Sequence, residues 1–163
     1  MRFIHVAAGI IRDERGILLV QQEGEGRRYW SLPGGVVLPG ESAPAGLVRE
    51  VREETGVVIH GLRGLSHITE IQMPDTTVIA CVFDVSTWDE TVSGADPGGE
   101  VVAVEWVAQP EAVARLGRLP WLAMSEPITE HLAGRGVPYY TYQQSTSGEQ
   151  TRIPGLFTTE GAQ

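Results

Sequence analysis

One stretch constrains this chain more than any other: Gly34–Val57, with the sequence GGVVLPGESAPAGLVREVREETGV. Glycine and proline pairs at its start mark turns, because proline fixes one backbone angle and glycine permits conformations closed to other residues. Glu41 and Ser42 then lie at the expected start of a helix, and Pro44 is tolerated in its first turn. Gly56 supplies the C-terminal stop. The stretch therefore predicts a loop followed by about three turns of helix.

The expected helix carries three acidic side chains on one face. Glu50, Glu53 and Glu54 stand at positions i, i+3 and i+4, and residues with this spacing are neighbours on a helix surface. Their mutual repulsion weakens the helix, and a hard divalent cation such as Mg²⁺ would relieve it by binding carboxylate oxygens. For three glutamates alone, an exposed acidic surface is the simpler interpretation. The other face is apolar and is expected to be buried: Leu47, Val48 and Val51.

The spacing of the whole stretch changes that balance. Gly35 is followed by five residues, Glu41, seven residues and then the run Arg49–Val57. This order resembles the Nudix box, G-x5-E-x7-R-E-U-x-E-E-x-G-U with U aliphatic, and the chain matches it at every defined position. So long a pattern of fixed residue types seldom arises by chance. The resemblance extends more loosely over most of the chain, to an expected helix that ends near Ala133.

The resemblance implies an α+β protein with the Nudix fold, in which a mixed β-sheet is sandwiched between α-helices. It also implies Mg²⁺-dependent hydrolysis of the pyrophosphate linkage in a nucleoside diphosphate linked to another moiety, such as a nucleoside triphosphate or an ADP-ribose-like compound. Mn²⁺ is a possible substitute for Mg²⁺. The alternative is a catalytically silent Nudix domain that binds or senses a nucleotide ligand. Because every box residue is present, the enzyme is favoured.

The same resemblance assigns roles to individual residues. Arg49 is expected to act in catalysis by holding the acidic side chains in place through ion pairs. Glu41 is expected to orient the loop and the helix without binding metal. A bound ion would offset the charge of the pyrophosphate and activate a water molecule. The expected metal ligands are the backbone carbonyl of Gly35 and the carboxylates of Glu50, Glu53 and Glu54.

The general base stays open among three glutamates. Some relatives use a glutamate within the box, which here is Glu53. Others use a glutamate on a later loop, near a strand that leads to a tryptophan. Glu100 fits this second pattern because it directly precedes the run Val101–Trp106. Glu105 is the remaining candidate.

Candidate substrate-binding residues lie just before the box. Residues 22–28 are polar and contain glycine, so they are expected to form a loop. Arg27 and Arg28 could clamp phosphate, and Tyr29 could stack on a base. An exposed loop is the competing interpretation for the two arginines, and packing is favoured for Trp30. The box does not identify the nucleotide, which is expected to be selected by residues 22–30, 70–77 and 89–100 and by the C-terminal segment.

Other functional classes are excluded or disfavoured. The glycines of the loop have the spacing of a phosphate-binding P-loop, but Glu41 stands where that loop needs a lysine. The single cysteine, Cys81, and four histidines without close spacing make no zinc motif, and Cys81 is expected in the core. A net charge of −9 argues against a nucleic-acid polymer as partner. Neither a signal peptide nor a membrane-spanning run is evident, so we expect no membrane partner and a cytoplasmic location.

The remaining segments predict one domain with more strands than helices. Strands are expected at residues 3–11, 17–21, 57–62, 65–72, 77–85 and 101–107, and helices at 110–116 and 120–132. Residues 17–21 are expected to pair back on the first strand as a hairpin. The run 77–85 is the most strand-like and is expected to be central and buried, whereas 89–99 is expected to be a loop.

The C-terminal segment differs from the rest in composition. Residues 1–134 form the predicted Nudix hydrolase domain, and residues 135–163 form a predicted polar C-terminal tail beyond the compact fold. Tyrosines at 139, 140 and 142 interrupt the polar sequence of this tail. They are expected to dock on the domain or on the second subunit of a possible homodimer.

Overall fold

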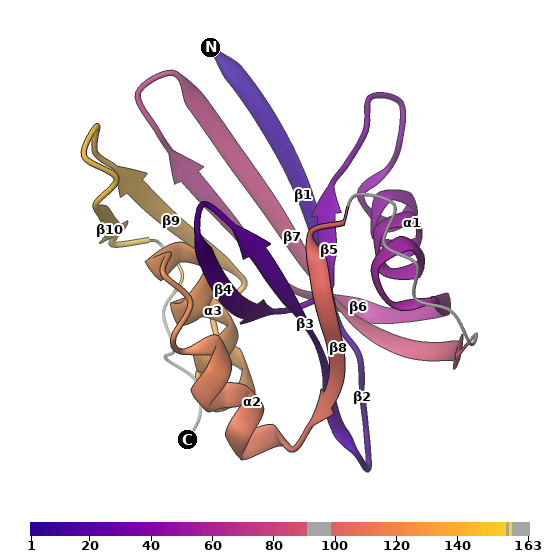
Figure 1. The fold of residues 1–163 in the computed structure, drawn as a ribbon. Coiled ribbons are helices and arrows are strands. Elements are labelled where there is room, and N and C mark those ends of the chain that lie inside the picture. The colour runs from indigo at the N-terminus through magenta and orange to yellow at the C-terminus, as the bar shows by residue number, and fades with distance from the viewer. Residues whose placement is uncertain (91–98, 156, 158–163) are drawn as a thin grey trace.

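The computed structural model describes residues 1–90, 99–155 and 157, which form two β-sheets and three helices (Figure 1). In chain order the elements are β1 (Arg2–Ile10), β2 (Arg12–Asp13), β3 (Gly16–Gly24), β4 (Arg27–Ser31), β5 (Gly34–Val36), α1 (Ala43–Thr55), β6 (Val57–Gln72), β7 (Thr76–Glu90), β8 (Val101–Val107), α2 (Gln109–Leu116), α3 (Leu122–Leu132), β9 (Tyr139–Gln144) and β10 (Gln150–Ile153).

The larger sheet is mixed. Its six strands lie in the order β10-β9-β6-β7-β1-β5, with parallel β1–β7 and β6–β9 pairs and antiparallel pairs elsewhere. The smaller sheet has four strands, in which β3 pairs with β2, β4 and β8. Strand β7 lies between β6 and β1, so the expectation of a central strand is confirmed.

Helices cover both faces of the larger sheet. Ala7 of β1 packs in the core cluster that contains Leu47 of α1, whereas Ala8 packs against the cluster that contains Ile128 of α3. Successive residues of a strand point to opposite faces, so α1 and α3 lie on opposite sides of the sheet (Figure 1). The expected α+β sandwich is therefore confirmed. Among the described residues, no helix is long and apolar enough to cross a membrane.

Helix α1 begins and ends at the residues that its sequence indicates. The side chain of Ser42 accepts a hydrogen bond from the N–H of Ala45, which caps the first turn. Gly56 ends the helix with φ of 75°, a left-handed conformation that glycine adopts at little cost. The apolar stripe is also confirmed, since Leu47 and Val51 are fully buried. Helix α2 begins one residue earlier than expected and α3 two residues later than expected.

Strands β6 and β7 are longer than expected. The two strands predicted at 57–62 and 65–72 form one continuous strand, whose register against β7 shifts several times near Gly61 and Gly64. These irregularities let the strand bend without ending, which is the usual role of a β-bulge. Strand β7 continues to Glu90, so the start of the expected loop at 89–99 is strand. Residues 91–98 of that expected loop lie outside the described residues.

The loop expected at residues 22–28 is instead the end of a β-hairpin. Strand β3 runs to Gly24 and β4 begins at Arg27, which leaves Glu25 and Gly26 as the turn. Both turn residues have positive φ, 52° and 72°, and such two-residue turns match the twist of paired strands. Strand β3 also pairs with β2 over only two residues, rather than with β1, and its longer partners are β4 and β8.

The expectation of a C-terminal tail beyond the compact fold is wrong for residues 139–153. Strand β9 pairs in parallel with β6 and joins the larger sheet, and β10 pairs with β9. Tyr140 and Tyr142 alternate along β9 and are 1% and 0% exposed, so both rings lie on the buried face. Their hydroxyls donate to Glu130 and Glu126 of α3. A domain boundary at residue 134 stays a prediction.

Candidate active site

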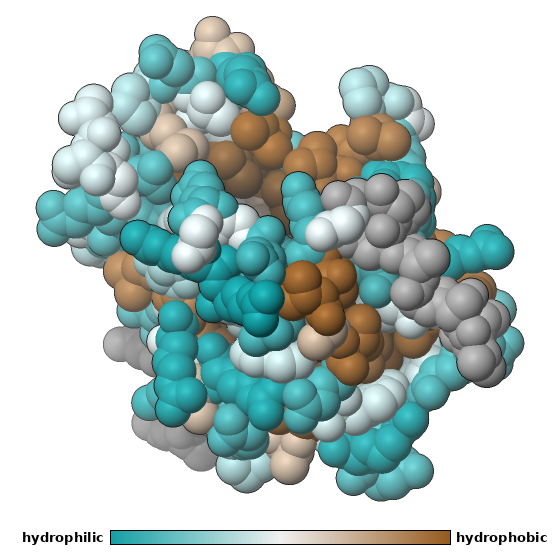
Figure 2. All heavy atoms as spheres, viewed as in Figure 1, coloured by the Kyte–Doolittle hydropathy of each residue, from teal (hydrophilic) through white to brown (hydrophobic). Residues whose placement is uncertain are grey.

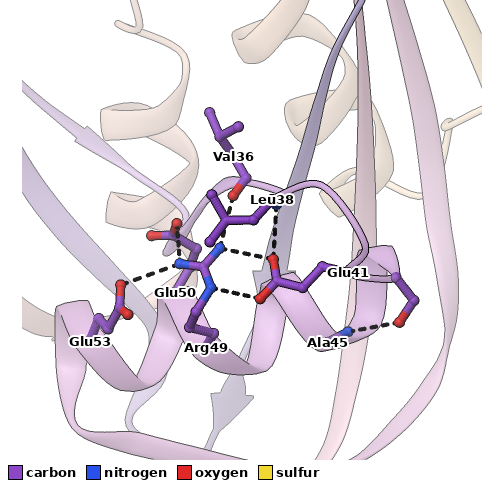
Figure 3. A network of polar contacts seen from close by, with 8 residues as sticks. Val36, Leu38, Glu41, Ala45, Arg49, Glu50 and Glu53 are labelled. Carbon is purple, nitrogen blue, oxygen red and sulfur yellow. Dashed lines mark hydrogen bonds and ion pairs between the residues drawn. The ribbon is translucent and has the colours of Figure 1, made fainter.

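The guanidinium of Arg49 joins the acidic face of α1 to the preceding loop (Figure 3). Its Nε and Nη2 donate to the two carboxylate oxygens of Glu41, at 2.7 and 3.0 Å. Its Nη1 donates to Glu50 at 2.7 Å and to Glu53 at 3.3 Å. Nη2 also donates to the carbonyl of Val36 at 2.9 Å. One side chain thus fixes three carboxylates and a strand end. The ion pairs with Glu50 and Glu53 agree with the role expected of Arg49, whereas the contacts with Glu41 and Val36 come from the structure.

The carboxylate of Glu41 holds the other end of the loop. It accepts a hydrogen bond from the N–H of Leu38 at 2.9 Å in addition to the two from Arg49. These contacts, with Arg49 first, lower the pKa of Glu41 to about 2. The same ion pairs raise the pKa of Arg49 above its ordinary value. Both groups therefore keep their charges over the whole working pH range.

Gly35 lies where the backbone of β5 meets the carboxylate of Glu50. A Cβ atom at this position would lie 2.5 Å from Cδ of Glu50, which is closer than nonbonded atoms approach. Gly35 also pairs with Ala7 in the larger sheet, so its backbone cannot move away freely. A glycine here leaves room for the Glu50 carboxylate beside the backbone.

The other two glutamates of the acidic face differ in exposure. Glu54 is 8% exposed and accepts a hydrogen bond from the N–H of Gly34 at 3.0 Å. The side chain of Glu53 is 41% exposed. The face therefore offers one carboxylate held against the loop and one open to solvent.

The donor types of this face suit a hard divalent cation. Carboxylate and carbonyl oxygens are the ligands that Mg²⁺ prefers. Because Gly35 has no Cβ atom, its backbone lies directly against the carboxylate of Glu50. However, no group of three or more His, Cys, Asp or Glu side chains in the described residues is arranged to hold a metal. Arg49 contacts one carboxylate oxygen of Glu50 and one of Glu53, and it does not contact the other oxygen of either group. The metal ligands stay a prediction.

The three candidates for the general base lie in different places. Glu53 belongs to the Arg49 network on α1. Glu100 lines a cavity of about 260 Å³ next to the β3–β4 hairpin. Glu105 forms an ion pair with Arg115 of α2 at 3.0 Å. The structure therefore brings only Glu53 together with the other box residues.

The three candidate substrate-binding residues are divided by the pleat of β4. Arg27 and Tyr29 line the same cavity as Glu100, whereas Arg28 donates to Glu23 at 2.9 Å and is not part of its lining. Tyr29 packs edge-on against Trp121, with ring centroids 5.1 Å apart, and its hydroxyl donates to Gln22. Burial raises the pKa of Tyr29, and nearby carboxylates, including Glu100 and Glu54, raise it further.

A second cavity, of about 150 Å³, lies between the larger sheet and helices α2 and α3. Its lining is largely apolar and includes Val6 and Ala8 of β1, which pair with Val36 and Gly34 of β5. The cavity therefore lies on the opposite face of the sheet from α1, directly beside the strand that carries the loop. Figure 2 shows hydrophobic surface recessed behind the β3–β4 hairpin, the region of this cavity.

The sequence did not single out the polar residues of the apolar cavity. Ser31, His67 and Thr69 line it, and each is 3% exposed. The available signal was weak: Ser31 interrupts the apolar run around Trp30 and Leu32, and His67 lies on a strand. Neither position belongs to a motif, and only the fold brings the two side chains to one cavity.

Comparisons with known proteins show which proteins this chain resembles. A family model described as NUDIX domain matches residues 2–129. Nudix hydrolase 7 of Arabidopsis thaliana is 27% identical over 131 residues, which cover 74% of this chain and 44% of that protein. The 8-oxo-dGTP diphosphatase of Haemophilus influenzae is 43% identical over 60 residues, covering 35% of this chain and 44% of that protein. The matches span less than half the length of these curated relatives.

Solved structures share the fold. The MutT protein from Bacillus halodurans has a TM-score of 0.69 at 23% sequence identity, covering 93% of this chain and 99% of that one. The solution structure of the Escherichia coli ORF135 protein has a TM-score of 0.67 at 25% identity, covering 82% of this chain and 91% of that one. These likenesses extend over nearly the whole chain, including the sheet that positions the loop and α1.

Proposed function

Because the chain belongs to the NUDIX family, we propose that it hydrolyses the pyrophosphate linkage of a nucleoside diphosphate linked to another moiety, with Mg²⁺ as cofactor and Mn²⁺ as a possible substitute. The observation that carries this proposal is the network in which Arg49 holds Glu41, Glu50 and Glu53 together on one face of α1. This network places carboxylates beside the Gly34–Gly35 backbone. A cation bound there would offset the charge of an anionic substrate.

The residues that would hold the ion are the box glutamates and the carbonyl of Gly35. When bound there, Mg²⁺ would offset the charge of the pyrophosphate and lower the pKa of a water molecule. Arg49 holds the carboxylates of Glu50 and Glu53 together and orients them, and Glu41 fixes Arg49 in turn. Because these contacts fix the positions of the carboxylates, the groups that face the substrate do not have to rearrange during the reaction.

We assign the general base to Glu53 rather than to Glu100 or Glu105. Its carboxylate is open to solvent on the acidic face, so water reaches it there. In the proposed reaction the water oxygen forms a bond to one phosphorus, the anhydride P–O bond breaks, and the water proton passes to the Glu53 carboxylate. The bridging oxygen leaves with one of the two phosphorylated products.

The apolar cavity would take the group that the substrate carries beyond its phosphates. Ser31 lines the cavity and lies three residues before Gly34, so a substrate with its phosphates at the loop is within reach of both. The relatives named 8-oxo-dGTP diphosphatase and CTP pyrophosphohydrolase support a nucleotide as substrate. The cavity at Arg27, Tyr29 and Glu100 would contact a second part of a longer substrate.

A panel of nucleoside triphosphates and ADP-ribose-like compounds, assayed with Mg²⁺ and with Mn²⁺, tests the proposal. We expect hydrolysis of at least one class, and about a thousandfold loss of kcat (roughly 4 kcal/mol) in Glu53→Gln. Glu111→Gln is the matched control, because Glu111 pairs with Arg115 across the same i,i+4 spacing on another helix. Binding of nucleotides without turnover, seen as a thermal shift, would instead indicate a sensing domain.

A further inference from the structure

The apolar cavity is lined by three polar side chains, those of Ser31, His67 and Thr69. The hydroxyl of Ser31 is buried, and its Oγ makes no hydrogen bond within the part of the chain that the structure describes. Buried hydroxyls are normally paired, because removing them from water without compensation costs free energy. An unpaired hydroxyl that lines a cavity is therefore placed to bind a ligand.

His67 is another polar residue of this cavity. Its Nδ1 lies 2.9 Å from Oγ of Ser66, whereas Nε2 makes no hydrogen bond to any described residue. The ring is held in place by an edge-on contact with Tyr140, whose ring centroid lies 5.7 Å away, and by the ring of His131 at 6.1 Å. One ring nitrogen is thus used to orient the imidazole, and the other is free for a ligand.

The imidazole of His67 is uncharged at neutral pH. Burial, and secondarily the proximity of His131, lower the pKa of His67 to about 4. His131 itself lies 3.6 Å from Asp84, which also faces Arg12 at 3.8 Å. Among the described residues, the lining contains no Asp, Glu, Lys or Arg, so the cavity suits an uncharged ring.

We propose that His67 determines which nucleotide the chain accepts, because its Nε2 and the Oγ of Ser31 hydrogen bond to the polar edge of a nucleobase in this cavity. The inference rests on the proposed function for the identity of the ligand as a nucleotide. The cavity volume of about 150 Å³ is well below that of sites for whole drug-sized ligands, roughly 300–1,000 Å³. It therefore holds one ring system and leaves the sugar and phosphates toward β5.

A site that hydrogen bonds a ligand discriminates strongly against analogues that leave its polar groups unpaired. A histidine that only supports the core has no such effect. We therefore expect His67→Leu to change the ratio of kcat/KM between the preferred nucleotide and the others by about tenfold or more, mainly through KM. His67→Gln, which retains a donor and an acceptor, should restore part of the preference. A uniform loss for all nucleotides would overturn the proposal.

A binding experiment decides the inference without requiring catalysis. Imidazole ¹⁵N spectra of the full chain are recorded with AMP, GMP, CMP and UMP in the absence of metal. The Nε2 signal of His67 should shift with some monophosphates and not with others, whereas His60, exposed on the same strand and paired with Asp89, should not respond. If no monophosphate moves the His67 signal, the inference fails even where hydrolysis is observed. If the signal moves selectively but nothing is hydrolysed, the inference stands and the proposed activity fails.

Ile128→Val is the control for a change in cavity shape. Ile128 lines the same cavity and is 2% exposed, but it offers no hydrogen bond. Its truncation should change the dissociation constants of the four monophosphates by similar factors. If it altered their ranking as strongly as His67→Leu, selection would depend on shape, and the role assigned to His67 would be wrong. Thermal melts confirm that each variant is folded.

Discussion

The acidic face of α1 and the apolar cavity lie on opposite sides of the same sheet, and they are built in opposite ways. In the network on α1, Arg49 pairs with Glu41, Glu50 and Glu53, so each of these carboxylates has a positive partner close in sequence. The cavity instead collects side chains from Val6 to Ile128, and neither the Ser31 hydroxyl nor Nε2 of His67 makes a hydrogen bond to a described residue.

This difference separates two tasks. Fixed charges on one helix and one loop can act on a phosphate group that all substrates share. A cavity assembled from several strands and helices can distinguish substrates by the chemical group in which they differ. Substitutions on the two sides should therefore have different signatures: a loss common to all substrates on α1, and a change in preference or in stability around the cavity.

The largest effect is expected at Tyr140, whose ring packs against His67 of the cavity. Tyr140 is 1% exposed, and its hydroxyl accepts from the N–H of Val137 at 3.0 Å and donates to Glu130 at 2.8 Å. Tyr140→Ala should lower the free energy of unfolding by about 3–5 kcal/mol, as for other large buried aromatics. Urea denaturation of both proteins measures this.

Tyr140→Phe separates packing from hydrogen bonding. It keeps the ring and removes the two hydroxyl contacts, so we expect a loss of about 1–2 kcal/mol. If Tyr140→Ala lowered the free energy of unfolding by less than Tyr140→Phe does, the packing of residues 139–153 on the domain would contribute little to stability. The paired strands β9 and β6 argue for the opposite result.

Arg49→Met should give the next largest effect, and on activity rather than on stability. The variant keeps the length of the side chain but releases Glu41, Glu50 and Glu53, whose positions Arg49 fixes. Loss of such a supporting contact typically costs up to about 100-fold, or roughly 2.7 kcal/mol of barrier. We expect a similar factor for every substrate in the panel.

Arg115→Met is the matched control, because Arg115 also bridges two glutamates, Glu105 and Glu111, but on α2. Its replacement should change kcat/KM little. A change in nucleotide preference in the Arg49 variant would break the proposed separation between the two sides of the sheet.

The two regions also differ in how far the sequence predicts them. The ion pairs of Arg49 with the glutamates of its own helix could be predicted from the resemblance to the Nudix box, and the i,i+4 spacing of Arg49 and Glu53 agrees with them. The sequence did not predict that Arg49 also pairs with Glu41. Ser31 and His67 could not be predicted, since 36 positions of chain separate them and only the strand order brings them together.

The same reasoning explains the error at the C-terminus. Composition marked residues 139–144 as part of a polar tail, yet the alternation of Tyr140 and Tyr142 is the period of a strand with one buried face. That alternation is too short to identify a strand unless its partner is known. The partner, β6, lies about 70 residues earlier in the chain, at Ile68↔Tyr139 in the pairing register.

A smaller effect is expected from pH, again on the cavity side. The pKa of His67 falls from 6.5 to about 4 on folding, so the unfolded chain binds more protons between these values. The contribution of His67 to stability is therefore complete above about pH 6.5 and is lost as pH falls toward 4, by at most about 1.4 kcal/mol per pH unit.

The measurement compares unfolding free energies of the native chain and His67→Gln at several pH values. The difference between the two proteins should depend on pH from 6.5 to 4 and level off below 4. Glu41 titrates lower, with a pKa of about 2, so it contributes a separate loss in stronger acid that both proteins share. A pH-independent difference would mean that His67 is not buried as the structure shows.

The smallest effect, at Ser31, has opposite signs for stability and for function. Its Oγ is fully shielded from solvent and makes no hydrogen bond to any described residue. Ser31→Ala removes an unpaired hydroxyl from an apolar site, so the variant should be more stable by up to about 1 kcal/mol. The same change removes a ligand contact and should raise KM for the preferred nucleotide.

On the α1 side, where each carboxylate that Arg49 contacts is paired, Glu50→Gln should not stabilise the protein. If Ser31→Ala were destabilising, its hydroxyl would have a partner in the free protein, and the contrast between a satisfied network and an unsatisfied cavity would not hold.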